Sequence, residues 1–249
     1  MPSDAVLMEI DREWTAACQV QQRFMQRLAP VTDTLDCSAG CRQAHQLGGD
    51  FYDFIPLPDR RIAVAVGDAS GKGLAAALMI SNVQSSLRTA AFLTGNHVAE
   101  VLGAVNRQVY GSSLADRYAT LFYGVFDRDT RILRYVNAGH HPPMVIRQDG
   151  SVLWLETGGA PVGMFPDWDY EEGAVHLHPG DTILAYTDGV VEAANLAGED
   201  WGVEGLRGAA LDGGATCADE LVRDIFSSMD EFSNGRQVDD ATVVVMRVP

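Results

Sequence analysis

Five aspartates stand beside apolar, strand-like runs that are far apart in the sequence. They are Asp50 before "FYDFIPL", Asp68 after "RIAVAVG", Asp188 after "TILAYT", and Asp239 and Asp240 before "ATVVVMRV". An isolated Asp at a strand end is usually a turn former. Several carboxylates brought together without a His or Cys cluster would instead suit a hard cation, Mg²⁺ or Mn²⁺. We therefore hypothesise that strand ends gather these aspartates around metal.

The glycine-rich stretch "GDASGKG" around Asp68 invites comparison with a phosphate-binding P-loop. That motif requires a glycine five residues before its Gly-Lys pair and a hydroxyl side chain directly after it. Val66 and Gly73 occupy those two positions. The P-loop is therefore excluded, and a direct role for Asp68 as a metal ligand explains the stretch better.

The composition is that of a globular protein of 249 residues, 47% hydrophobic and 21% charged. A net charge of −16 disfavours binding to nucleic acid or to an anionic membrane, because phosphate groups would be repelled. The four cysteines fit no dense disulfide framework, the N-terminus lacks signal-peptide features, and no run reaches the ~18 apolar residues of a membrane span. We expect a cytoplasmic protein with reduced cysteines, binding neither nucleic acid nor membrane.

The N-terminal segment has the spacing of a helical seam. Steps of three and four residues connect Leu7, Ile10, Trp14, Ala17, Gln21, Phe24 and Leu28. This heptad pattern leaves two interpretations open. In the first, the helix contacts another chain, as a coiled-coil dimer or as a helix that transmits a signal from a partner. In the second, the helix packs on its own domain. Pro30 is expected to end it, because proline lacks an N–H group and disfavours helical geometry in the preceding residue.

Beyond this segment, short apolar runs joined by tight turns predict antiparallel strands. The runs are "RRIAVAVG", "YATLFYGVFD", "RILRYVNAG", "PPMVIRQ", "SVLWLE", "DTILAYTDG" and "ATVVVMRV". Turns are expected at 127–130 and 149–150, and helices at 73–93, 97–111 and 217–232. Strands clustered together with helices around them predict an α+β fold, in which helices cover sheet layers.

Seven stretches in a fixed order carry a family resemblance. They are "GGDFYD", "GDASGKG", "ATLFYGVFD", "NAGHHPP", "GGAPVGMF", "YTDGVVEAAN" and "DDATVVVMRV". In this order they resemble the bacterial PPM-type, metal-dependent serine/threonine phosphatases of the SpoIIE and RsbU kind. The resemblance implies a helical linker or regulatory segment at residues 1–34 and a PPM-type phosphatase domain at residues 35–249. It also implies two packed antiparallel sheets flanked by helices, with a two-metal centre at one edge.

By this resemblance, Asp68 bridges two Mn²⁺ or Mg²⁺ ions and the backbone carbonyl of Ala69 is a further ligand. Asp50 is implied to bind one ion, and Asp188 and Asp239 the other. Asp68 and Asp188 are the residues expected to be catalytic. The expected reaction is in-line attack on phosphorus by a metal-activated water, without a covalent enzyme intermediate.

Three more residues are secondary candidates for the site. Asp240 matches a family position that is less strictly a metal ligand. Lys72 lies beside the metal turn and could attract substrate phosphate, although a surface lysine at a helix start is an equally good explanation. His140 matches the family's "NAGH" turn and is expected at the edge of the site, in contact with substrate.

Two cysteine arrangements are better explained without chemistry. Cys217 and Arg223 have the spacing of thiol-based phosphatases, but they would lie about 240° apart around a helix. The acidic residues between them would also raise the pKa of the thiol. Cys37, Cys41 and His45 are too few ligands for a structural zinc site, and the alternation of a strand would bury both cysteines on one face.

The resemblance further implies a partner, a phosphorylated anti-sigma factor antagonist that loses its phosphate to the enzyme. An upstream sensor domain or activator is implied as well, and the N-terminal helix offers a homodimer contact. Two other functions stay open. One is a catalytically silent binding or scaffold module with the same fold, which would usually have lost a metal ligand. The other is a metal hydrolase of a small phosphoester, because pocket walls set substrate choice.

Overall fold

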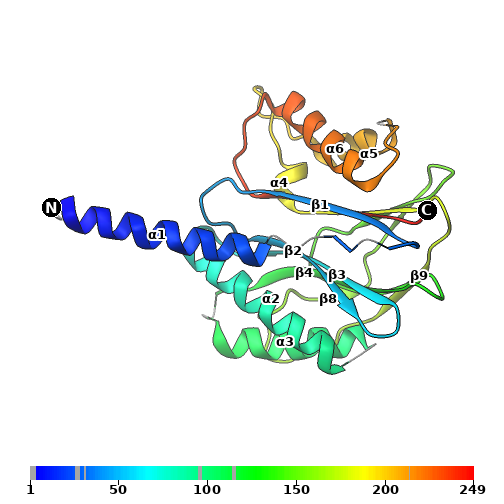
Figure 1. Cartoon of the computed structure of the whole chain (residues 1–249), viewed down its shortest axis with the longest axis horizontal. Coiled ribbons are helices and arrows are strands. Elements are labelled where there is room, and N and C mark those ends of the chain that lie inside the picture. The colour runs from blue at the N-terminus through cyan, green and yellow to red at the C-terminus, as the bar shows by residue number, and fades with distance from the viewer. Residues whose placement is uncertain (1–3, 26–28, 31, 95–96, 114–115, 213) are drawn as a thin grey trace.

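The computed structural model describes residues 4–25, 29–30, 32–94, 97–113, 116–212 and 214–249, with the backbone alone for residues 4–7 and 25. Two sheets lie face to face, and helices cover both outer faces (Figure 1). One outer layer contains α2 (Leu74–Thr94) and α3 (Val98–Ser112). The other contains α4 (Asp188–Val191), α5 (Gly202–Asp212) and α6 (Ala218–Ser233). The predicted α+β sandwich is thereby confirmed.

The two sheets are named here after their central strands. The β3 sheet has the order β2-β3-β4-β5-β8, with β9 also paired to β5, and the β11 sheet has the order β1-β11-β10-β6-β7. Among the described strands, every pairing is antiparallel except that of β5 with β8. The strand bounds are β1 Asp36–Arg42, β2 Asp50–Leu57, β3 Arg61–Ala69, β4 Ala119–Asp127, β5 Ile132–Ala138, β6 Met144–Ile146, β7 Val152–Trp154, β8 Gly158–Gly159, β9 Gly173–His176, β10 Thr182–Tyr186 and β11 Ala241–Arg247.

Strand register carries the aspartates to one end of the sandwich. In the β3 sheet, Asp50 pairs with Asp68, and Asp68 pairs with Thr120 on β4. Directly paired residues point to the same face of a sheet, and here that face looks toward the β11 sheet. In the β11 sheet, Asp188 follows the end of β10, and Asp240 immediately precedes β11. The antiparallel pairing of β10 with β11 places both at the same edge.

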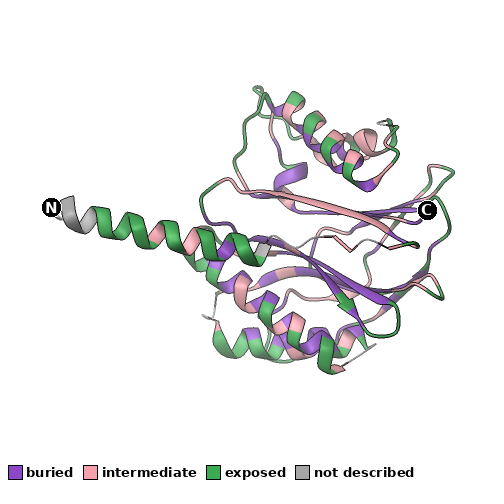
Figure 2. Ribbon diagram, viewed as in Figure 1, coloured by how far each residue is buried: buried purple, intermediate pink, exposed green. Residues whose placement is uncertain are grey.

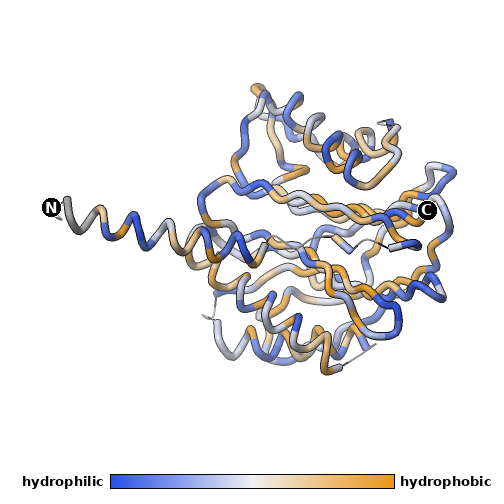
Figure 3. The backbone as a smooth tube through the Cα atoms, in the orientation of Figure 1, coloured by the Kyte–Doolittle hydropathy of each residue, from blue (hydrophilic) through white to orange (hydrophobic). Residues whose placement is uncertain are grey.

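Three hydrophobic cores hold the four layers together, and the strands that Figure 2 shows as mostly buried are largely apolar in Figure 3. Phe122 and Val244 belong to the core between the two sheets. Leu87 on α2 belongs to the core beneath α2 and α3, and Ile225 on α6 to the core on the opposite side. Each fully buried side chain of this size contributes about 1.5–3 kcal/mol through removal from water. The site is therefore mounted on strands that are packed on both faces.

Helix α1 (Asp4–Met25) extends away from the sandwich, and most of its surface is exposed (Figure 2). Along the predicted seam, Ile10 and Phe24 are exposed, Trp14 is half-buried and Gln21 is buried. The C-terminal part of the helix thus contacts its own domain, while the N-terminal part leaves its seam uncovered. The homodimer remains a prediction.

Parts of the expected N-terminal seam lie outside the described residues. No side-chain position is described for Leu7 or Leu28, and the chain between Met25 and Pro30 is described only from residue 29. The proposed stop at Pro30 is therefore not tested. Among the described residues, none of the helices combines the length and apolar character that a bilayer span requires.

Helix α5 is the main element that the sequence pattern does not reveal. Gly202, Gly205 and Gly208 lie within it, and glycine is a poor helix former because it loses much conformational freedom. Leu206 is the side chain that this helix buries. With so little apolar periodicity, the helix is held by packing on its neighbours rather than by local propensity.

Candidate metal centre

The carboxylates of the sequence hypothesis come together at the strand ends. The charges of Asp188, Asp239 and Asp240 all act on the Asp68 carboxyl, and the charges of Asp68 and Asp240 act on Asp50. Burial, followed by these neighbouring carboxylates, raises the pKa of Asp68 from 3.8 to about 7. Such an accumulation of like charge is unfavourable unless a cation compensates it.

Asp50 is the most deeply buried of these aspartates, at 1% exposed. Its Oδ2 accepts hydrogen bonds from the Oγ1 atoms of Thr187 and Thr242, both at 2.7 Å. Its Oδ1 is buried and has no hydrogen-bond partner among the described residues. Burial and the nearby Asp68 raise its pKa well above the ordinary value. A buried carboxylate with one unpartnered oxygen fits a site that receives a cation.

The described side chains do not adopt the positions of a complete metal coordination sphere. Within the described part of the chain, no three His, Cys, Asp or Glu side chains form a ready-made metal site. Several carboxylates have protein partners instead. Lys72 Nζ lies 2.5 Å from Asp239 Oδ2, and the Gly189 N–H donates to Asp188 Oδ1 at 2.7 Å. The donor set fits Mg²⁺ or Mn²⁺, and the predicted ligand roles remain predictions.

Asp240 differs from the others because both of its oxygens bind backbone. Oδ1 accepts the N–H of Ala44 and Oδ2 accepts the N–H of Gly49, each at 2.8 Å. A Cβ on Gly48 would stand 2.6 Å from Asp240 Oδ2, so only glycine lets the chain pass this close. These contacts explain the "GG" before Asp50 and favour Asp240 as the anchor of the loop over a role as a ligand.

The backbone around Ala69 is fixed from two sides. The Ala69 N–H donates to the Gly49 carbonyl at 3.1 Å. Next to it, Ser70 exchanges hydrogen bonds with Tyr118, and Arg117 Nη1 donates to the Ser70 carbonyl at 2.8 Å. Sequence reasoning misses Arg117, because it lies far along the chain from "GDASGKG" and acts on a carbonyl. The sequence feature that could have indicated it is a single basic residue directly before "YATLFYGVFD".

Of the two predicted substrate contacts, Lys72 is exposed and His140 is buried. Lys72 is occupied by its ion pair with Asp239, which raises the pKa of the ammonium group. His140 Nδ1 lies 2.9 Å from Thr120 Oγ1, and burial followed by the neighbouring His141 lowers its pKa to about 3. His140 is therefore neutral and arranged to orient Thr120, which pairs with Asp68. Contact of either residue with substrate remains a prediction.

The sequence implies no ligand role for the cysteines, although Cys41 lies near the centre, where after burial the charge of Asp50 raises the pKa of its thiol. All four are free. Burial raises the pKa of both the Cys37 and the Cys41 thiol to about 12 on strand β1. Cys217 is the N-cap of α6, and Arg223 donates to Asp219 on the same helix. The zinc and thiol-phosphatase arrangements rejected on sequence grounds have no support in these contacts.

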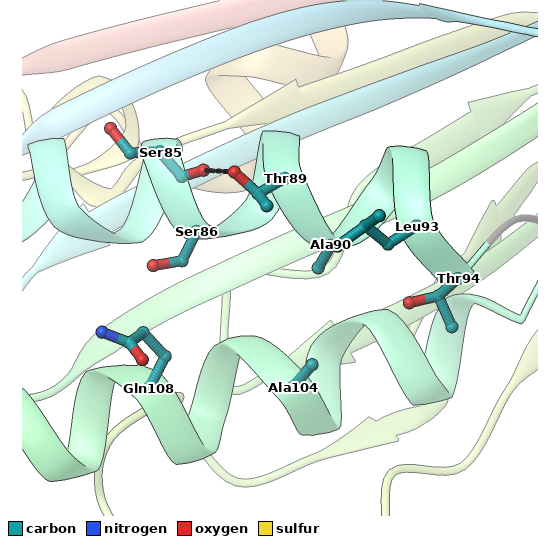
Figure 4. A pocket seen from close by; sticks show the side chains of 8 residues that line it. All are labelled: Ser85, Ser86, Thr89, Ala90, Leu93, Thr94, Ala104 and Gln108. Carbon is teal, nitrogen blue, oxygen red and sulfur yellow. Dashed lines mark hydrogen bonds between the residues drawn. The ribbon is translucent and has the colours of Figure 1, made fainter.

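A groove of about 430 Å³ lies between α2 and α3 (Figure 4), and none of the candidate aspartates lines it. Its walls include Thr89 and Leu93 on α2 and Ala104 and Gln108 on α3. Within these walls the Thr89 hydroxyl is bonded to the carbonyl of Ser85, as an ordinary helical side chain. The groove contributes no charged group, so the chemistry is expected at the strand ends.

Comparison with known proteins gives a consistent result. The family model "Stage II sporulation protein E (SpoIIE)" matches residues 58–249. Phosphoserine phosphatase RsbU of Bacillus subtilis (strain 168) is 31% identical over 245 residues, covering 97% of this chain and 72% of RsbU.

Two solved structures share the fold. The RsbU and RsbW domains of Rv1364c from Mycobacterium tuberculosis superpose with a TM-score of 0.72 at 28% identity, covering 88% of this chain and 62% of that one. The SiaA-PP2C domain of Pseudomonas aeruginosa gives a TM-score of 0.83 at 22% identity, covering 99% and 100%. This second likeness concerns the fold alone.

Proposed function

The chain belongs to the SpoIIE family of metal-dependent phosphatases, and on that premise we propose that it removes phosphate from phosphoserine or phosphothreonine of a partner protein. One observation supports hydrolysis most directly. Asp50 and Asp68 pair across two strands and both have raised pKa values, and Asp50 is deeply buried with one unpartnered oxygen, at the edge where Asp188 and Asp239 also lie. A chain that kept only the fold would have no need to hold these charges together.

The proposed ligands are those implied by the family. Asp68 and the Ala69 carbonyl would hold the metal together with Asp50 on one side and Asp188 and Asp239 on the other. When bound, Mg²⁺ or Mn²⁺ supplies the Lewis acidity that activates water and withdraws charge from a phosphoryl group. The number of ions and the choice between the two metals belong to this proposal.

The chain's own groups prepare the site in three ways. Thr187 and Thr242 hold Asp50 by one oxygen, so its other oxygen is directed away from them. Arg117 holds the turn after Asp68 through the Ser70 carbonyl. Lys72 partly neutralises Asp239, and ligation by Asp239 would free its ammonium group for a substrate phosphate. These contacts fix geometry before substrate arrives, which is most of what phosphoryl transfer asks of a protein.

The proposed substrate is a phosphorylated anti-sigma factor antagonist. The support is the similarity to RsbU, named a phosphoserine phosphatase, and to a chain in which RsbU and RsbW domains occur together. In this arrangement an upstream sensor domain or activator would control the enzyme. A silent scaffold and a small-phosphoester hydrolase remain the competing functions.

Phosphate release distinguishes these functions. We would assay wild type and Asp68→Asn with an aryl phosphate and with a panel of phosphorylated antagonist proteins, with Mn²⁺ or with chelator, using Asp167→Asn at an exposed loop position as the matched control. The proposal expects metal-dependent release from a phosphoprotein that Asp68→Asn abolishes and Asp167→Asn retains. Release from the aryl phosphate alone would favour a small-phosphoester hydrolase. Metal binding without release from any substrate would favour the scaffold.

A further inference from the structure

Arg61 is a buried cation at the end of strand β3 that lies away from the metal centre. Its side chain is only 9% exposed. Its Nε donates to the Pro58 carbonyl at 3.1 Å, and its Nη2 donates to Asp59 Oδ2 at 3.1 Å. Its Nη1 is buried and has no hydrogen-bond partner among the described residues. Because an unpartnered buried donor is costly, this nitrogen favours an acceptor from outside the described chain.

Arg61 lines a cavity of about 240 Å³. The walls combine a second cation, Arg134, with the apolar side chains of Val125 and Ile132. Val125 pairs with Arg134 across β4 and β5, and Arg61 pairs two residues further along β4. Directly paired and alternate residues share one face of a sheet, so the strand register brings these side chains together. At roughly 30 Å³ for each water molecule, the volume corresponds to about eight waters, which is enough for a small organic molecule.

The cavity also contains one carboxylate, whose charge is already compensated. Asp127 Oδ1 accepts the N–H groups of Asp129 and Thr130, at 2.9 and 2.8 Å. These bonds, that of Thr130 first, lower the pKa of Asp127 below its ordinary value, and the charge of Arg61 acts in the same direction. Asp127 is thereby fixed as part of the turn between β4 and β5. The two arginines of the wall therefore leave an excess of positive charge.

Both arginines are paired with acidic side chains in contacts that solvent already reaches. Asp59, the partner of Arg61, is 85% exposed. Arg134 donates to Glu172 at 2.9 Å and is itself 53% exposed. Exposed ion pairs contribute little free energy, because water screens them. An anion that enters the cavity can therefore compete with these contacts for the guanidinium groups.

A second unpartnered donor lies in the same region. Tyr123 precedes Val125 by two residues on β4 and so faces the same side of the sheet. Its hydroxyl is buried and has no hydrogen-bond partner among the described residues. Burial raises the pKa of this hydroxyl, and the charge of Arg61 opposes the rise, so the two groups are close enough to interact. A phenol and a guanidinium thus both lack an acceptor here.

We propose that this cavity binds a small organic anion with a carboxylate or phosphate head group. Arg61 and Arg134 hold the head group, because the planar donor set of a guanidinium matches carboxylate and phosphate oxygens. Val125 and Ile132 contact the apolar part of the ligand. The site is separate from the metal centre. Arg61 begins β3 and Asp68 comes near its end, roughly 23 Å away at about 3.3 Å for each residue of a strand.

Probes of similar size test the ligand class. Benzoate carries a carboxylate, phenylphosphonate carries a phosphate-like group on a bond that phosphatases do not hydrolyse, and benzamide is the neutral counterpart of benzoate. Each is titrated by isothermal calorimetry into protein that has been freed of metal with chelator and then dialysed, so that neither metal nor chelator competes. We expect benzamide to bind at least about tenfold more weakly than the better of the two anions. Binding of benzoate alone identifies a carboxylate ligand, and binding of phenylphosphonate alone a phosphate ligand.

Variants of the wall locate the bound anion. Arg61→Gln and Arg134→Gln each remove one guanidinium group, and Arg61→Lys keeps the charge without the planar donor set. Arg223→Gln removes an exposed arginine of α6 and is the matched control. We expect binding about tenfold weaker or worse in Arg61→Gln, a smaller loss in Arg61→Lys and in Arg134→Gln, and wild-type affinity in Arg223→Gln.

Three results would overturn the proposal. The first is equal affinity for benzoate and benzamide, because charge would then play no part in binding. The second is the absence of binding by either anion at millimolar concentration. The third is wild-type affinity in folded Arg61→Gln and Arg134→Gln; if Arg61→Gln does not fold, Arg61→Lys and Arg134→Gln make the same comparison. The measurement needs neither metal nor hydrolysis, so its result is independent of the proposed phosphatase function.

Discussion

Replacing Asp68 by Asn should make the metal-free protein more stable at alkaline pH. The Asp68 pKa is raised from 3.8 to about 7 by burial and by Asp188, Asp239 and Asp240. The folded state therefore holds this proton more tightly than the unfolded state does. The stabilisation from proton binding is complete below pH 3.8 and is lost as the pH rises through about 7. At pH 8 the carboxylate is ionised in both states, and the full penalty of burying it operates.

The size of the effect follows from the same shift. A rise of roughly three in pKa is equivalent to about 4 kcal/mol of unfolding free energy. Asp68 is only partly buried, and solvent and side-chain relaxation reduce the repulsion, so we expect Asp68→Asn to gain about 2 kcal/mol at pH 8. The gain should shrink toward zero near pH 4, where the wild-type carboxyl is protonated in the folded state.

Urea unfolding followed by tryptophan fluorescence, with chelator present, measures this difference at pH 8 and pH 4.5. Asp167→Asn serves as the control for loss of one exposed charge. Adding saturating Mn²⁺ should reverse the order at pH 8, because a cation stabilises only the state that binds it. Equal or lower stability of metal-free Asp68→Asn at pH 8 would refute the view that uncompensated carboxylates strain this site.

Three other perturbations probe different parts of the molecule. Gly48→Ala places a Cβ 2.6 Å from a carboxylate oxygen. It should lower the unfolding free energy measured in urea by about 1–3 kcal/mol and weaken Mn²⁺ binding. The control Gly111→Ala, which has open space around its Cβ, should neither destabilise the protein nor weaken Mn²⁺ binding. His140→Gln should reduce the loss of unfolding free energy at acid pH. The pKa of His140 is lowered to about 3, so the wild type loses stability as the pH falls below 6.5, by up to about 1.4 kcal/mol per pH unit. An unchanged pH dependence of the unfolding free energy would contradict the burial of a neutral imidazole. If α1 forms a dimer, changing Trp14 and Phe24 together to Ser should lower the mass found by light scattering, and a variant with wild-type mass and basal activity would remove the dimer hypothesis.

The sequence predicts the aspartates at the strand ends better than it predicts the residues that hold these aspartates in place. Asp50 and Asp68 could be found because each stands against an apolar run, and antiparallel pairing then forces strand ends together. Thr187 and Thr242, which hold Asp50, could not be found in this way. Each acts through a single hydrogen bond or a backbone contact with a residue far along the chain, and a polar residue in a strand or an exposed helix carries no periodic signal of such a partner.

The hydrogen-bond donors around each aspartate show which carboxylates hold the backbone in place and which keep an uncompensated charge. Residue type and spacing in the sequence do not reveal this difference. Asp240 has two backbone N–H groups, one for each oxygen, so its charge is compensated without metal. Asp50 has two hydroxyl donors on one oxygen and none on the other. Asp68 is surrounded mainly by like charge. Binding of a cation is therefore most favourable beside Asp68 and Asp50 and least favourable beside Asp240. Asp240 instead holds the backbone at Ala44 and Gly49 in place, and so supports the position of the other carboxylates.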